Sequence, residues 1–162
     1  MRYVFPCAVE LDEEHLRDTG QEGYNASFPD VHGAHTCGDT VQEVSDRLQD
    51  CLEVALGGYL RDGEDLPEPS DPEPDQVLVA VSPAVAGQFA LHEAMLANGV
   101  TAAELARRIG LRPSHAKRLT DIYRPAKPDE VERALAALGL QMVSEATPLE
   151  QWTPSHDPAP AR

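Results

Sequence analysis

Basic side chains are concentrated between Thr101 and Lys127, a segment with seven Lys and Arg residues and only two acidic ones. Side chains of this kind bind DNA because cations neutralise phosphates and their hydrogen-bond donors reach base edges. We expect nine residues of this segment to contact DNA: Arg107, Arg108, Arg112, Ser114, His115, Lys117, Arg118, Arg124 and Lys127.

Two short helices joined by a tight turn would position these side chains. Thr101 and Glu104 have the spacing of a capping box, and Gly110 lies where the turn requires a positive φ. The sequence therefore predicts a helix-turn-helix whose second helix points its N-terminus into the major groove. Its core is expected to contain Leu105, Ala106, Ile109, Leu111, Ala116, Leu119 and Ile122.

The basic residues divide into two expected roles. Lys117 and Arg118 are expected to touch base edges or phosphates. Four others hold phosphates and set the register on DNA: Arg107, Arg108, Arg124 and Lys127. The alternative is a small helical bundle with a solvated basic face. The DNA interpretation is favoured because every core position fits the pattern and the local charge is positive.

Acidic charge lies in the other half of the chain, whose net charge is −15 over 162 residues. Residues 1–75 carry 4 basic and 19 acidic side chains, whereas residues 76–162 carry 9 of each. The first half therefore suits a basic partner. From charge alone, we expect the partner contacts to include Asp30, Asp39, Glu43 and Asp46.

Strand patterns dominate this acidic half. Period-two alternation predicts strands at 2–10 and 24–28, and a short third strand at 31–37. An acidic loop is expected from Glu10 to Glu22. The continuous apolar run at 77–81 predicts a strand that is buried on both faces or paired across a subunit interface.

One long helix separates the third and fourth strands. Thr40 caps its start and Gly63 ends it, while Gly57 and Gly58 are expected to weaken its last turns. A proline-rich, acidic linker follows at 66–76. Helical spacing predicts a buried stripe of Val41, Val44, Leu48, Leu52, Leu56, Tyr59 and Leu60.

These elements predict an α+β protein of two domains. Residues 1–81 form a β-β-β-α-β partner-binding unit, and residues 82–143 form an all-α DNA-binding domain. The proline-rich tail, 144–162, is expected to be disordered. Helices of the second domain are predicted at 84–98, 102–109, 113–122 and 129–138.

Several short motifs occur in an informative order. The first half contains the strand Tyr3–Val9, then Phe28-Pro29-Asp30, Gly38-Asp39-Thr40 and Asp62-Gly63-Glu64. The second half contains Glu104–Leu111 (ELARRIGL) and Glu132–Gly139 (ERALAALG). Together these segments resemble the HicB antitoxin family over most of residues 1–140.

The resemblance implies a degraded RNase H-like N-terminal unit and a Cro/repressor-type helix-turn-helix. Members of the family bind HicA, a small mRNA-cleaving toxin, and cover its catalytic histidine and RNA surface. They also bind the operator of the shared operon. The implied partners are a HicA-like basic toxin, operator DNA and a second copy of the chain, because a two-fold operator requires at least a dimer.

Two other functions stay open. A stand-alone transcription regulator would use the acidic half to sense a ligand or another protein. An active nuclease would need converging carboxylates that hold two metal ions. The candidate carboxylates are Glu10, Asp12, Asp30, Asp39, Glu43 and Asp46. Their spacing does not place a cluster of them on neighbouring strands, so we expect no enzyme, no catalytic residue and no cofactor.

Metal binding and export are not expected either. His32 and His35 lie near Cys37, but alternation along a strand would place the two histidines on opposite faces, without a fourth ligand. Three widely spaced cysteines form no disulfide framework. No signal peptide and no run long enough to span a bilayer is found, so we expect a cytoplasmic protein without membrane partners.

Overall fold

The computed structural model describes residues 3–124 and 126–143. These residues form ten helices and strands in the order β1 (Val4–Leu11), α1 (Glu13–Thr19), β2 (Tyr24–Ser27), β3 (His35–Gly38), α2 (Val41–Asp62), β4 (Gln76–Ala80), α3 (Pro83–Ala97), α4 (Ala102–Ile109), α5 (Pro113–Leu119) and α6 (Pro128–Ala136). The predicted mixed α+β class is confirmed. No helix in these ranges is long and apolar enough to cross a membrane.

The described residues form two compact units. We call residues 3–55 and 67–80 the sheet unit, and residues 56–66, 81–124 and 126–143 the helical unit. The last turns of α2, from Leu56 onward, thus belong to the helical unit. The domain limits expected from the sequence, 1–81 and 82–143, stay a prediction, and the expected disordered tail lies outside the described residues.

The sheet is antiparallel, with strand order β3-β2-β1-β4. β1 pairs with β2 through its second half and with β4 through its first half, and Ala8 is paired in both registers. The strand predicted at 77–81 therefore completes this sheet. The first of its two expected settings, burial on both faces, is wrong, because β4 lies at an edge and Leu78 is 52% exposed. Pairing of this strand across a subunit interface stays a prediction.

Two predictions between β1 and α2 are also wrong. The expected acidic loop contains α1, which begins where the Asp12 carboxylate accepts a hydrogen bond from the His15 N–H (2.9 Å) and ends at Gly20 with φ 74°. Acidic side chains in its first turn favour this helix electrostatically. The third strand begins only at His35, because the preceding residues turn and Gly33 has φ 79°.

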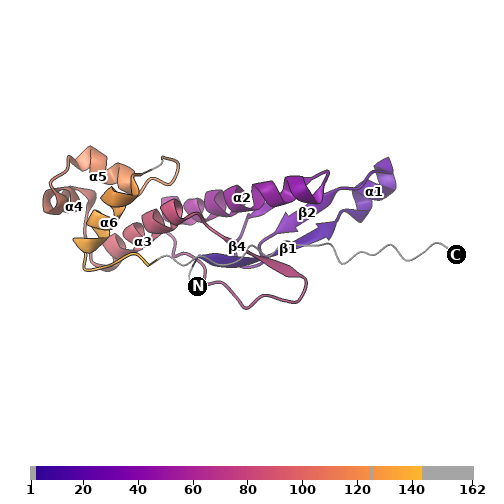
Figure 1. Ribbon diagram of the computed structural model, residues 1–162, viewed down its shortest axis with the longest axis horizontal. Coiled ribbons are helices and arrows are strands. Elements are labelled where there is room, and N and C mark those ends of the chain that lie inside the picture. The colour runs from indigo at the N-terminus through magenta and orange to yellow at the C-terminus, as the bar shows by residue number, and fades with distance from the viewer. Residues whose placement is uncertain (1–2, 125, 144–162) are drawn as a thin grey trace. The chain divides into compact units, whose positions relative to one another are not determined.

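The first part of α2 covers one face of the sheet (Figure 1). The predicted stripe of buried side chains is confirmed at Val44, Leu48, Leu52, Leu56 and Leu60, whereas Val41 and Tyr59 are half-buried. Each fully buried leucine contributes about 1.5–3 kcal/mol of transfer free energy. Two side chains of α2 also bond strand carbonyls: Arg47 donates to Cys37 O (2.7 Å) and Gln49 to Ala80 O (2.9 Å).

The helical unit has its own core, to which α3, α4, α5 and α6 contribute. The predicted core residues Leu105, Ala106, Ala116 and Leu119 are at most 1% exposed. Helix α3 begins at Pro83 after the Ser82 N-cap. Helix α5 ends at Leu119, three residues before the predicted end, because Thr120 leaves the helical conformation and the Asp121 carbonyl accepts a side-chain hydrogen bond from α3.

Candidate nucleic-acid interface and partner-binding face

The α4–α5 pair is positioned by local sequence. The Thr101 hydroxyl accepts a hydrogen bond from the Glu104 N–H (3.2 Å), which starts α4. Gly110 ends that helix in the left-handed region with φ 71°. Pro113 then occupies the first turn of α5, where its missing N–H costs nothing. The predicted helix, turn and helix are therefore present at the predicted residues up to Leu119.

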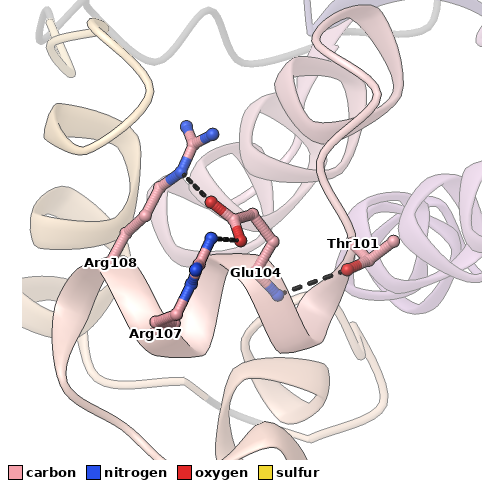
Figure 2. Close-up of polar contacts among 4 residues, drawn as sticks. All are labelled: Thr101, Glu104, Arg107 and Arg108. Atoms are coloured by element: carbon pink, nitrogen blue, oxygen red, sulfur yellow. Dashed lines mark hydrogen bonds and ion pairs between the residues drawn. The ribbon is translucent and has the colours of Figure 1, made fainter.

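The carboxylate of Glu104 forms a fork with two arginines (Figure 2). It pairs with the Arg107 guanidinium and with Arg108 Nε at 2.9 Å. These hydrogen bonds, from Arg108 first and Arg107 second, hold the pKa of Glu104 below its usual value. A full capping box would also have the Glu104 carboxylate accept a hydrogen bond from the Thr101 N–H, but this carboxylate faces the two arginines instead.

Two more of the predicted DNA-binding residues are paired with acids. His115 Nε2 lies 2.9 Å from a carboxylate oxygen of Glu130, and Arg124 Nε lies 3.4 Å from Asp121. The His115–Glu130 pair lines a cavity of about 160 Å³ together with Arg118, Leu119, Ala126 and Lys127. Four of the nine candidates, Arg107, Arg108, His115 and Arg124, are thus paired with acidic side chains of the same chain.

The other five candidates form an exposed set that we call the basic face. It consists of Arg112, Ser114, Lys117, Arg118 and Lys127, all of them exposed. Within the described ranges, none of them pairs with an acidic side chain. Three come from α5 and Arg112 is its N-cap, so the structure brings four of them to one short helix.

Sequence reasoning missed Gln88 of α3. This side chain is only 1% exposed and donates its amide N–H groups to the carbonyls of Asp121 (3.0 Å) and Arg124 (3.3 Å). It therefore holds the chain that leaves α5. An isolated glutamine among apolar residues 83–91 was the available indication, because a buried amide must find partners.

Three of the four predicted partner-binding acids lie at the start of α2. Glu43 accepts a hydrogen bond from the Asp39 N–H (3.1 Å), and Asp46 accepts one from the Gln42 amide (2.8 Å). Asp50 follows at helical spacing and is also exposed, which the sequence analysis missed. We call Asp39, Glu43, Asp46 and Asp50 the acidic face.

Asp30 has a different environment. Its carboxylate accepts hydrogen bonds from both the N–H (2.9 Å) and the hydroxyl (3.0 Å) of Ser70. Asp30 thus fastens the proline-rich segment to the turn between β2 and β3. Its contact with a partner stays a prediction.

Among the groups weighed for catalysis or metal binding, Asp12 has a clear structural role and His32 lies outside a strand. Asp12 caps α1 and accepts a bond from Asn25 (3.0 Å), and the His15 backbone N–H and Asn25 lower its pKa. The expected placement of His32 and His35 on one strand is wrong, because His32 lies in the turn before β3; both side chains are exposed. Among the described residues, no group of three or more His, Cys, Asp or Glu side chains suits a metal ion.

Comparison with known proteins decides the family. Residues 6–87, from β1 into α3, match the model of a HicB-like antitoxin of bacterial toxin-antitoxin systems. The chain belongs to the HicB antitoxin family. Membership implies a toxin as partner, and all four predicted partner-binding acids lie inside the matched residues. The nine predicted DNA-binding residues lie beyond them.

Relatives of similar length carry the same family name. Antitoxin HicB of Escherichia coli strain K12 is 36% identical over 127 residues, which cover 78% of this chain and 92% of the relative. Antitoxin HicB of Pseudomonas fluorescens strain Pf0-1 is 36% identical and covers 86% and 92% of the two chains. Antitoxin HicB 2 of Photorhabdus laumondii is 34% identical and covers 86% and 91%. The similarity to HicB antitoxins therefore extends well beyond residues 6–87.

Proposed function

We propose that this HicB-family protein neutralises a small, basic, mRNA-cleaving toxin of the HicA type and represses its own operon by binding operator DNA. The observation that carries the proposal is the separation of charge. The acidic face lies within the family-matched residues, and the basic face, most of it on α5, lies outside them. One chain thus presents surfaces for two partners of opposite charge.

The acidic face supports the toxin-binding role. A ribonuclease that grips RNA must be basic, and exposed carboxylates on one side of α2 compete with RNA phosphates for that surface. We propose a degraded RNase H-like fold for the sheet unit, with a binding role in place of catalysis.

The basic face supports the operator-binding role. Arg112 is the N-cap residue of α5, Ser114 lies in its first turn, and Lys117 and Arg118 lie in its last turn. The first turns of a recognition helix meet base edges in the major groove, and basic side chains farther along it reach base edges or phosphates. Lys127 precedes α6 and is suited to a phosphate. We propose that α4 and α5 act as a helix-turn-helix, and that two copies of the chain read a two-fold operator in the cytoplasm.

Co-purification tests the toxin-binding role first. This chain is expressed with the small open reading frame next to its gene, and only this chain is tagged. A stable complex with a small basic protein that is toxic when expressed alone is the expected result. Failure of any partner to co-elute, with a harmless neighbour, would leave a stand-alone regulator as the better interpretation.

Gel-shift titration tests the operator-binding role separately. The probe is a labelled duplex from the region upstream of the chain's own gene, with a scrambled duplex of equal composition as control. We expect a higher affinity for the upstream duplex than for the scrambled one, and we expect the ratio of the two affinities to persist as the salt concentration is raised. Equal binding to both duplexes would remove the repressor role while leaving toxin neutralisation intact.

A further inference from the structure

The chain that leaves α5, residues 120–124, is held from two sides within the helical unit. We call it the exit segment. It contains Ile122, which faces the last turns of α2, and the carbonyls of Asp121 and Arg124, which face Gln88 of α3. The two restraints come from different helices and from different chemistry. Together they define where α5 ends.

Gly57 supplies the first restraint. A Cβ atom at this position would lie 1.9 Å from Ile122 Cδ1 and 2.9 Å from Ile122 Cγ1. Unbonded carbon atoms do not approach so closely, so a side chain at 57 would force the outer atoms of Ile122 to move. The adjacent Gly58 is different, because the nearest atom to its Cβ would be Arg61 Nη2 at 3.8 Å. Of these two glycines, only Gly57 would displace a side chain of the exit segment if it carried a Cβ atom.

Gln88 supplies the second restraint. Its amide is buried and both hydrogen bonds go to exit-segment carbonyls, at 3.0 Å and 3.3 Å. A buried amide that lost these acceptors would remain unpaired, which opposes any displacement of the segment. The Gly57–Ile122 contact and the Gln88 hydrogen bonds thus resist the same movement.

The exit segment matters because α5 has only seven residues. The direction of so short a helix depends on its buried side chains, Ala116 and Leu119, and on the chain at its two ends, here the Gly110 turn and the exit segment. Base readout requires side chains to be held within roughly 0.5 Å of their productive positions. A shift of the exit segment would therefore move Lys117 and Arg118, which lie in the last turn of α5.

We infer that Gly57 and Gln88 are positioning residues for DNA recognition, and that the operator-binding module includes the last turns of α2, residues 56–62. This inference rests on the proposed operator-binding function. It goes further, because it assigns part of the helix that bears the acidic face to the DNA-reading module. Neither residue need touch DNA.

The test compares Gly57→Ala with Gly58→Ala in the full-length chain. Both changes remove a helical glycine, but only the first collides with Ile122. Gly58→Ala is expected to bind the upstream duplex like the parent chain and to raise Tm by about 2–4 °C. Gly57→Ala is expected to lower the affinity for that duplex by about tenfold, which is the effect of losing one base contact. Its affinity for the scrambled duplex should fall by a smaller factor. Toxin neutralisation should be unchanged in both variants.

A second-site change separates positioning from loss of folding. Ile122→Ala removes the atoms that collide, so Gly57→Ala combined with Ile122→Ala should bind DNA no more weakly than Ile122→Ala alone. Gln88→Met, which keeps the shape but not the donors, should reduce the ratio of specific to non-specific binding at a temperature where circular dichroism shows a folded chain.

The outcomes distinguish the inference from the function on which it rests. If the parent chain does not bind the upstream duplex, the operator-binding function fails and the inference fails with it. If the parent chain binds and Gly57→Ala binds equally well, or loses specific and non-specific affinity alike, the positioning role is overturned. Failure of Ile122→Ala to relieve the Gly57→Ala defect would overturn it as well.

Discussion

The acidic face and the α4–α5 region differ in how their charges are compensated inside the protein. Carboxylates of the acidic face accept hydrogen bonds from neutral donors, namely the Asp39 N–H and the Gln42 amide. Around α4 and α5, by contrast, Glu104, Glu130 and Asp121 each pair with basic side chains.

This difference has a functional reading. Exposed carboxylates that no basic side chain of the described ranges pairs with attract a basic partner and speed its association. A basic region that carries its own counterions binds DNA less strongly overall, so more of the binding energy must come from the few exposed side chains that can read bases. The following predictions test this contrast, from the largest expected effect to the smallest.

Neutralising the acidic face should have the largest effect. The triple variant Asp39→Asn, Glu43→Gln and Asp46→Asn keeps the hydrogen-bond acceptors and removes three charges. We expect toxin affinity to fall by about a hundredfold, mainly at low salt, because close charge pairs across an interface couple by several kcal/mol. Isothermal titration with the purified toxin at two salt concentrations measures this.

The matched control for that triple variant changes Glu64, Asp65 and Glu68 to their amides, which removes the same charge from exposed positions elsewhere. An equal loss of affinity in the control would mean that net charge, not the acidic face, attracts the toxin.

Removing an exposed arginine should lower operator affinity more than removing an arginine that is paired with an acidic side chain. Arg118→Ala is expected to lower operator affinity by about tenfold, in the usual range for a residue that contacts a base. Arg107→Ala should lower it by less than about threefold, because Glu104 already competes for its guanidinium. Fluorescence anisotropy with the upstream duplex compares the two. Equal losses would contradict the division between the basic face and the paired residues.

Removing the negative charge of Glu104, which pairs with Arg107 and Arg108, should raise DNA affinity. Glu104→Gln frees Arg107 and Arg108 from a shared negative charge, so we expect affinity for operator and scrambled duplexes to rise by about threefold and the salt dependence to steepen. Glu132→Gln, an exposed change of the same charge on α6, is the matched control. A gain confined to the operator duplex would show that Glu104 acts on base recognition and not as a general counterion.

The smallest effect concerns the stability of the helical unit at low pH. Burial of His92 lowers its pKa below 6.5, and its Nε2 atom is buried without a partner in the described residues. The unfolded chain therefore binds a proton more readily than the folded one, and stability falls as the pH drops through 6.5. In urea titrations at pH 7.5 and 5.5, His92→Gln should lose less stability on acidification than the parent chain. His35→Gln, at an exposed position, should lose as much as the parent chain.

Much of the fold was predictable from residues close in sequence. The stripe of α2, the Thr40 and Thr101 caps and the Gly110 turn all depend on side chains within one or two helical turns, and the structure confirms them. The wrong predictions have local and non-local causes. The Asp12 cap and Gly20 that bound α1 are themselves local features, whereas the early end of α5 and the half-exposed strand β4 depend on residues far away in the chain.

The candidate site divides in the same way. The sequence by itself determined which side chains are basic, which are acidic, and which helices carry them, because composition and periodicity are properties of short segments. Only the tertiary structure decided which charges are exposed and which are paired, since His115 meets Glu130 across 15 positions and Gln88 meets Asp121 across 33. The tertiary structure also gives the reason for the glycine at position 57. A missing side chain has no pattern of its own, and its reason becomes visible only when folding brings Ile122 into the space it leaves.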